Sequence, residues 1–365
     1  MQINRRPGLD LIRIFSALLV IICHSGVYFS IGFSVNFVTF AGVLAVELFF
    51  VMSGFLVGKS LIRTADSAEP GEGLKRFYIN RLLRILPLYY VTLVLTALTT
   101  GSGIPLSCFV FVQNFAQGDL EFLPQSWSLS VEAWFYFLAA PVFCLLVKAL
   151  RRKMSGEAAV WTAVAVLCLL PFLARVGDVL LLQPQWDEGV RKQIPLRLDS
   201  IGMGVALAAL KQYHPEAYRR RFSKPVFAAV SVVGILVIYR FYCGYLAIDD
   251  RFNASALSKI FMCCDLPMLC CLLVGFMDCT RWLDLLNAFP PVRWLSDWSY
   301  GVYLLQLVVF EAVSPYFADT RFSVSWLGFL LAICLTVALS AVTYFLIERP
   351  SGKLRDRLLA RQSIS

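Results

Sequence analysis

The chain has 365 residues, of which 59% are hydrophobic and only 16% are charged. Because soluble globular proteins carry about 25% charged residues, this composition excludes a sizeable soluble domain and indicates a polytopic membrane protein. The net charge of +9 could suggest a nucleic-acid partner. No basic patch is interleaved with aromatic residues, however, so we expect no nucleic-acid binding and assign the charge to cytoplasmic loops.

Ten apolar runs are long enough to form membrane helices at about 1.5 Å per residue. Their approximate bounds are 9–29, 40–61, 78–99, 127–147, 158–182, 195–211, 225–246, 257–279, 298–317 and 325–347. With a cytoplasmic N-terminus, loop Lys and Arg residues favour the inner side about three to one. We therefore predict an all-α integral membrane protein with about ten transmembrane helices and both termini cytoplasmic.

The two ends of the chain complete this prediction. Arg5 and Arg6 precede an apolar core, as in a signal peptide, but the core is too long and contains Arg13, which favours an uncleaved first helix. We divide the chain into a transmembrane domain, residues 1–350, and a basic, amphipathic cytoplasmic tail, residues 351–365, that we expect on the inner membrane surface.

The first run carries Asp10, Arg13 and His24. Ionisable residues inside a membrane helix are costly, so each is a candidate functional residue. Arg13 and His24 share a helix face and lie about 16 Å apart along the axis. The alternatives are an ion pair between Asp10 and Arg13 at the helix end, and a hydrogen-bonded packing role for His24.

The second run places Glu47 at a depth similar to that of His24 on an antiparallel neighbour. A carboxylate beside a histidine orients the ring and raises its basicity, as a general base requires. The alternative is a buried protonated Glu47 with a backbone partner. Ser53 and Gly54, on the same run, are interpreted as close-packing residues.

Arg81 and Arg84 open the third run, three residues apart on one face. Two arginines fixed on a helix can clamp phosphate groups, although such residues can also snorkel to the interface. Glu132, among serines and Trp127 near the predicted outer surface, fits a sugar-binding rim or an interfacial aromatic belt.

The remaining candidates lie on later runs. Arg197 and Asp199 lie near the outer end of the sixth run and could form a local ion pair. Glu348 ends the tenth run and could pair with a cytoplasmic-side arginine or be solvated. Eleven cysteines show no paired CxxC spacing and no neighbouring histidine, so we predict no metal site.

Depth sorts these residues into two layers. The inner layer, which suits a multiply phosphorylated cytosolic ligand, holds Asp10, Arg13, Arg81, Arg84 and Glu348. The outer layer, which suits acid–base chemistry on an extracytoplasmic acceptor, holds His24, Glu47, Glu132, Arg197 and Asp199.

Taken together, these residues resemble the membrane-bound acyltransferase type 3 family of O-acyltransferases over nearly the whole chain. The matching motifs, in order, are Asp10, Arg13 and His24; ELFFVMSGFL from Glu47 to Leu56; Arg81 and Arg84; Trp127 to Glu132; Ser299 to Leu304; and Glu348 to Pro350. Two positions depart from the family pattern. Glu47 stands where many members have Asp, and Gln306 where many have His.

The resemblance implies ten or more membrane helices, acyl-coenzyme A as cytosolic co-substrate, a carbohydrate acceptor and His24 as the catalytic residue. We therefore predict a multi-pass protein of the bacterial inner membrane that moves an acetyl group from acetyl-coenzyme A to a surface polysaccharide such as lipopolysaccharide O-antigen, without a bound cofactor. Arg13, Arg81 and Arg84 would bind the donor, while Glu47 would assist His24. His24 would deprotonate the hydroxyl or carry the acyl group itself.

Two other classes of protein fit the same polar residues. A transporter for a glycan or lipid-linked precursor would also place ionisable groups near the midplane. A structural partner protein would use them only to hold helices together. We see no inverted repeat, which favours the enzyme over the transporter.

Overall fold

The computed structural model describes residues 6–67, 70–115, 120–246, 251–317 and 322–361, and within these ranges it contains helices and no strand. The longer helices are α1 (Pro7–Tyr28), α2 (Val35–Asp66), α3 (Pro70–Thr100), α5 (Ser126–Trp134), α6 (Ala140–Leu150), α7 (Gly156–Leu182), α8 (Leu198–Tyr213), α10 (Pro225–Leu246), α12 (Ala256–Cys279), α13 (Pro290–Val313), α14 (Phe322–Thr343) and α15 (Arg349–Arg361). Short helices are α4 (Leu106–Phe109), α9 (Pro215–Phe222) and α11 (Arg251–Ala254). The π-helical turns are η1 (Phe135–Ala139), η2 (Trp186–Arg191) and η6 (Tyr344–Glu348), and the 3-10 turns are η3 (Ile194–Leu196), η4 (Trp282–Ala288) and η5 (Ser314–Tyr316).

Eight helical segments of the described chain are long and apolar enough to cross a membrane. This confirms the prediction of an all-α polytopic membrane protein. The other two predicted spans, 195–211 and 298–317, correspond to α8 and α13. Both are helical, but α8 has only 16 residues and α13 carries several charged side chains, so the total of ten stays a prediction.

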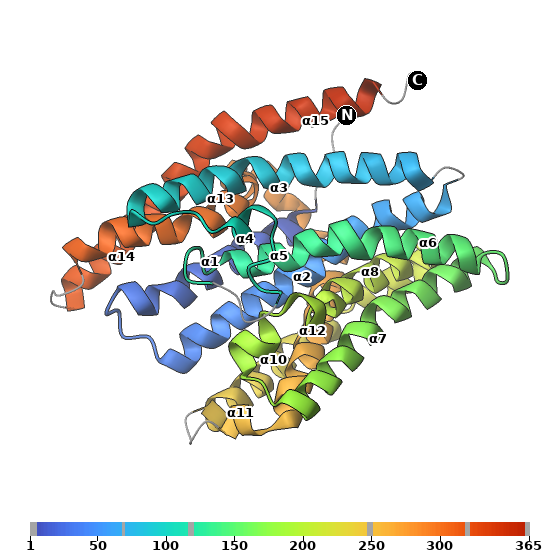
Figure 1. Ribbon diagram of the computed structural model, residues 1–365, viewed down its shortest axis with the longest axis horizontal. Helices are drawn as coiled ribbons and strands as arrows, with labels where there is room; N and C mark the ends of the chain where they lie inside the picture. Colours follow the sequence, from blue (N-terminus) through green and yellow to red (C-terminus); the bar gives the residue numbers. More distant parts are fainter. Residues whose placement is uncertain (1–5, 68–69, 116–119, 247–250, 318–321, 362–365) are drawn as a thin grey trace.

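Helix α2 runs through the middle of the bundle (Figure 1). It packs against α1, α3, α6, α8 and α12, and 83% of its most apolar stretch is buried by them. Only 11% of the corresponding stretch of α10 is buried, so the apolar surface of that helix is left for lipid. The polar residues of α2 therefore face protein on nearly all sides.

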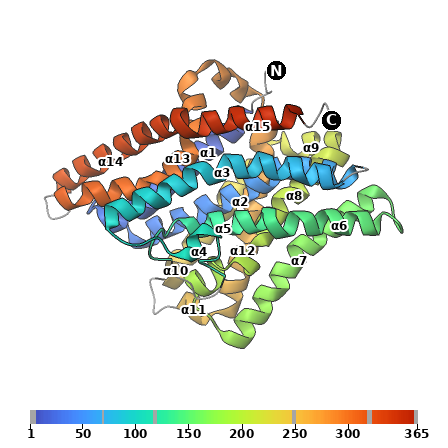
Figure 2. The same cartoon turned by 45° about the horizontal axis from the view of Figure 1, so that its top comes forward.

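Helix α15 continues α14 and lies alongside α3 (Figure 2). The joined segment Ser325–Ala360 has 36 residues, about 54 Å at the rise of an α-helix, which exceeds the ~30 Å hydrocarbon core. The predicted tail, residues 351–365, is thus a helix packed on α3 as far as it is described. Residues 362–365 lie outside the described residues, and the domain division stays a prediction.

Helices α2 and α8 approach each other closely because both present glycines at their contact. A Cβ atom on Gly54 would lie well within 3.0 Å of the Ile201 backbone, and one on Gly204 would collide with the Val51 backbone. Small residues at such contacts let membrane helices pack at short distance. The prediction that Gly54 is a close-packing residue is confirmed.

Gly54→Ala should lower the free energy of unfolding by about 1–3 kcal/mol, because the added methyl group meets backbone atoms that cannot rotate away. Thermal unfolding in detergent would measure this. Gly177→Ala in α7 is the matched control, since nothing lies within 4 Å of its added Cβ, and it should stabilise the helix slightly. Equal melting temperatures for Gly54→Ala and wild type would contradict the close contact.

Candidate active site

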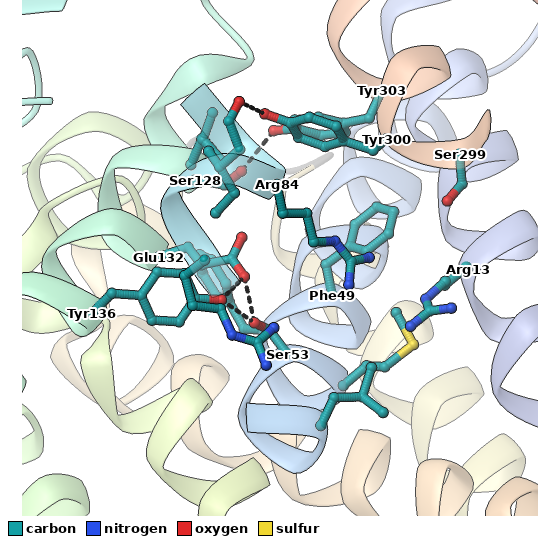
Figure 3. A pocket seen from close by; sticks show the side chains of 16 residues that line it. Arg13, Phe49, Ser53, Arg84, Ser128, Glu132, Tyr136, Ser299, Tyr300 and Tyr303 are labelled. Carbon is teal, nitrogen blue, oxygen red and sulfur yellow. Dashed lines mark hydrogen bonds between the residues drawn. The ribbon is translucent and has the colours of Figure 1, made fainter. Parts of the chain in front are cut away.

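A pocket of about 120 Å³ lies between α1, α2, α3, α5 and α13 (Figure 3). It brings together three arginines, Arg13, Arg81 and Arg84, from two helices that are distant in sequence. The sequence analysis placed the same three residues in one layer. Their grouping is therefore a property of the fold, while their role in donor binding stays a prediction.

Arg13 is held in the pocket wall by a buried carboxylate. Arg13 Nη1 donates to Asp10 Oδ1 at 3.2 Å, and Ser296 Oγ of α13 donates to the same oxygen at 2.6 Å. The ion pair between Asp10 and Arg13 that the sequence analysis considered thus exists. The bond from Ser296 to Asp10 also links α1 to α13. Asp10 supports Arg13 and does not line the pocket itself.

Arg81 and Arg84 make no direct ion pair in the described chain, although Glu132 lies near Arg81 and Glu348 lies near Arg84. No ion pair within 4.0 Å joins either arginine to the described residues. The guanidinium of Arg81 lies over the rings of Phe77 and Tyr136, about 6 Å from each centroid. Arg84 is exposed. Both charges are therefore available to an anionic ligand that enters the pocket.

Glu132 lies in this pocket and not at an outer rim. Its Oε1 accepts short hydrogen bonds from Ser53 of α2 and Tyr136 of η1 (Figure 3). The prediction that Glu132 belongs to the outer layer is wrong, because the carboxylate lines the same pocket as the arginines. The interpretation of Ser53 as a packing residue also missed its hydrogen bond to Glu132.

The cause of this error is the depth at which α5 begins. Gln125 and Ser126 are 2% and 1% exposed, so the helix starts inside the protein. Gln125 Nε2 donates to the Leu304 carbonyl at 2.8 Å, in the middle of α13. Glu132 lies about 9 Å further along the helix. The apolar run of the sequence marks the helix but not the depth of its first residue.

Two π-helical turns lie next to carboxylates of this region, and each precedes a proline. Ala140 N donates to the Phe135 carbonyl before Pro141, and Arg349 N donates to the Tyr344 carbonyl before Pro350. Proline lacks the N–H that would continue the α-helical pattern, and π-turns are frequent at functional sites. The turn η1 follows Glu132, and η6 ends at Glu348.

Glu348 lies near Arg84, with which it interacts electrostatically. The two do not form an ion pair within 4.0 Å, and Glu348 Oε1 has no hydrogen-bond partner among the described residues. The predicted pairing of Glu348 with a cytoplasmic-side arginine is therefore only partly seen. The carboxylate lies near Arg84 but forms no ion pair with it. Glu348 is better described as a neighbour of the pocket than as part of it.

Tyr303 lines the pocket from α13, about one helical turn beyond Ser299. Its hydroxyl contacts Ser128 Oγ at 2.6 Å and donates to the Gln125 carbonyl at 2.5 Å. Its ring packs edge-on against Phe49. One helical turn earlier, the Tyr300 hydroxyl donates to the Ile85 carbonyl at 2.8 Å. These bonds join α3, α5 and α13 around the pocket.

His24 lies beyond Tyr303, on the side away from the arginines. Helices α1 and α13 run parallel, joined by Asp10 and Ser296 at one end and by Tyr28 and Glu311 at the other. Between these contacts the imidazole of His24 lies beside Gln306, one turn past Tyr303. Its Nδ1 is buried and has no hydrogen-bond partner among the described residues.

Glu47 does not pair with His24. Its carboxylate forms a buried ion pair with Arg197 at the start of α8. The predicted partnership is wrong because Glu47, Val51, Gly54 and Gly58 follow a spacing of four, three and four, which turns all of them toward α8. Equal depth places two residues at one level but does not make their side chains face each other.

Arg197 and Asp199 also bind partners from other helices and do not form a local pair. Arg175 Nη2 in α7 donates to Asp199 Oδ2 at 2.6 Å, and its Nη1 donates to the Leu196 carbonyl. Arg175 and Arg197 are both fully buried. Arg175 lies inside the predicted run 158–182 but was not among the candidate residues, although its position in an apolar run was a signal of burial.

A second cluster that the sequence analysis missed lies near His24. Arg191 and Lys192, at and after the end of η2, both pair with Asp187 at 2.5 Å. Burial opposes the charge of Asp187, but the two cations hold its pKa at about 2, below the usual range. The cluster therefore carries one net positive charge near the imidazole of His24.

The acyltransferase-domain family model matches residues 6–345, which is nearly the whole described chain. The chain belongs to this acyltransferase family. Its pocket arginines, Glu132 and His24 all lie within the matched range. Among the described residues, no three His, Cys, Asp or Glu side chains are grouped so as to hold a metal ion.

Bacterial relatives of this acyltransferase carry names of O-acetyltransferases. A protein of Staphylococcus aureus (strain COL), named "Putative O-acetyltransferase", is 24% identical over 95% of this chain and 57% of its own length. The "Putative peptidoglycan O-acetyltransferase YrhL" of Bacillus subtilis (strain 168) is 24% identical over 94% and 54%. The "Peptidoglycan O-acetyltransferase OatA" of Listeria monocytogenes is 22% identical over 95% and 56%.

This acyltransferase spans only a little over half the length of these relatives. No solved structure matches the chain. The matches therefore show a membrane O-acetyltransferase family, and the apolar helices agree with a multi-pass membrane protein.

Proposed function

We propose that this acyltransferase moves an acetyl group from cytosolic acetyl-coenzyme A to a hydroxyl of an extracytoplasmic glycan. The observation that carries the proposal is the pocket that gathers Arg13, Arg81 and Arg84, with His24 further along α1 from Arg13. Arg13 and His24 are about 16 Å apart along α1. The rise of the helix gives this separation. A pantetheine arm of about 15–20 Å would therefore reach from Arg13 to His24.

The arginines would hold the phosphates of coenzyme A, because guanidinium groups bind phosphate through two parallel hydrogen bonds. His24 would then take the proton of the acceptor hydroxyl, or would accept the acetyl group and pass it on. Both routes use the free Nδ1 of His24 as the reacting atom. The proposal places the protein in the bacterial inner membrane, with the donor end and both termini on the cytoplasmic side.

The acceptor is a surface glycan in this proposal. The names of the Bacillus and Listeria relatives favour peptidoglycan, whereas the membrane setting also suits a polysaccharide such as lipopolysaccharide O-antigen. Mass spectrometry of both glycans, from cells with and without the protein, tests this directly. An acetyl-sized mass difference in one glycan identifies the acceptor. Transport of a glycan without consumption of acetyl-coenzyme A would overturn the proposal in favour of a transporter.

An Arg81→Ala/Arg84→Ala variant should bind acetyl-coenzyme A at least about tenfold more weakly, ~1.4 kcal/mol, because two unpaired cations are removed from the pocket. Its affinity should also depend less on salt, since salt screens exposed phosphate contacts. Even Arg→Lys should weaken binding, because lysine lacks the planar fork. Titration in nanodiscs at two salt concentrations measures both effects.

The matched control is Lys75→Ala/Arg76→Ala, which removes the same charge from the same helix outside the pocket. It should leave donor affinity unchanged within about twofold. If the double alanine variant at Arg81 and Arg84 binds acetyl-coenzyme A as wild type does, the donor site is elsewhere.

A further inference from the structure

Gln306 is a buried residue whose side-chain carbonyl oxygen makes no hydrogen bond in the described chain. The side chain is fully buried on α13, and its Nε2 donates to the Tyr303 carbonyl at 3.2 Å. Its Oε1 has no hydrogen-bond partner among the described residues. Leaving a buried acceptor unpaired destabilises a folded protein. A fixed amide with a free oxygen therefore needs an explanation.

The Gln306 side chain is next to the imidazole of His24, with which it interacts. The bond from Nε2 to the Tyr303 carbonyl fixes the orientation of the amide, and Oε1 remains as its unused acceptor. An acceptor oxygen can bind only the ring nitrogen that carries a hydrogen. It therefore favours one tautomer of the imidazole and leaves the lone pair of the other ring nitrogen free.

The charged groups around His24 do not perform this task. On α2, Glu47 is committed to Arg197, and on α13, Glu311 is bonded to Tyr28 at the outer end. The nearby cluster of Asp187, Arg191 and Lys192 carries a net positive charge. The two oxygens of the Asp187 carboxylate are already paired with Arg191 and Lys192, and arginine and lysine cannot accept a hydrogen bond from the ring.

We propose that Gln306 is the positioning residue of His24: its Oε1 accepts a hydrogen bond from the imidazole, fixes the tautomer and directs the free nitrogen toward the reacting hydroxyl or acyl group. This inference rests on the proposed function, in which His24 reacts. A neutral amide orients the ring without adding a negative charge beside it. The role predicted for Glu47 thus belongs to Gln306.

Rates of acetyl transfer as a function of pH, in proteoliposomes with acetyl-coenzyme A, test the proposal. Gln306→Leu should lower kcat at least tenfold and leave KM for acetyl-coenzyme A within twofold. Gln306→Glu should retain more activity than Gln306→Leu and move the acid limb of the rate profile to higher pH, because a carboxylate stabilises the imidazolium. A change in packing alone would not move that limb.

Gln125→Leu is the matched control. Gln125 is also a buried amide whose Nε2 donates to an α13 carbonyl and whose Oε1 is unpaired, but it is not beside His24. It should lower the melting temperature as Gln306→Leu does, without moving the acid limb. Equal losses of kcat in the two leucine variants, or a wild-type profile in both Gln306 variants, would overturn the proposal.

A spectroscopic measurement separates this inference from the proposed function. The chain has only two histidines, so 15N-histidine labelling gives two imidazoles, and His214→Gln assigns them. Wild type should show His24 in one tautomer, and Gln306→Leu should mix the two. An unchanged His24 signal in Gln306→Leu refutes the positioning role. If His24→Ala retains transfer, the proposed function fails, and the spectrum still decides whether Gln306 fixes the ring.

Discussion

Replacement of His24 by Ala should lower acetyl transfer by at least about 10²–10⁴-fold, the range that general acid–base catalysis supplies, and leave the amount of protein in the membrane unchanged. The structural reason is that His24 makes few bonds that hold helices together. Its Nδ1 has no partner in the described chain, and the contacts between α1 and α13 are made by Asp10 and Tyr28.

The rate of acetyl transfer to the glycan is measured in proteoliposomes, together with the abundance and the melting temperature of the variant. His214→Ala is the matched control, because His214 is half-exposed and pairs with Glu157 away from the pocket. Near-normal transfer by His24→Ala would rule out His24 as the reacting residue. A loss of folded protein instead of turnover would favour a purely structural role for these polar residues.

The helices and most of the pocket arginines could be predicted from the sequence. Helical spans follow from the length of apolar runs, which the bilayer fixes. The grouping of Arg13 with Arg81 and Arg84 was predicted from their places near the starts of two apolar runs, although α3 itself begins earlier, at Pro70. An apolar run therefore reports the length of a helix well, and it reports the depth of a residue only where the helix begins at the surface.

The positions of side chains could not be predicted in this way where they depend on which neighbour a helix face contacts, or on the path of an irregular loop. Glu132 was misplaced because the segment before α5 enters the protein, so the helix does not begin at the surface. The two π-turns depend on prolines that also occur in ordinary helices. The face of α2 could have been found, because the glycines at 54 and 58 mark the side that approaches α8.

Glu47→Gln should lower the free energy of unfolding by about 3–5 kcal/mol, because it leaves Arg197 as a buried charge without its partner. Both side chains of this ion pair are nearly inaccessible to solvent, so water cannot compensate. Asp66→Asn is a useful comparison. It breaks the ion pair with Arg151, which is about one-third exposed on both sides, and exposed pairs contribute only about 0–1 kcal/mol.

The double variant Glu47→Leu/Arg197→Met separates loss of the pair from loss of a function of Glu47. Removing both charges avoids the unpaired ion, so the double variant should regain most of the stability that Glu47→Gln loses. If Glu47 only joins α2 to α8, the double variant should also regain acetyl transfer once it is folded. A melting temperature like that of wild type for Glu47→Gln, combined with a rate reduced more than about threefold, or ~0.7 kcal/mol of barrier, would return Glu47 to the chemistry at His24. In that case the ion pair with Arg197 would affect the reactivity of His24, and Glu47 would do more than join α2 to α8.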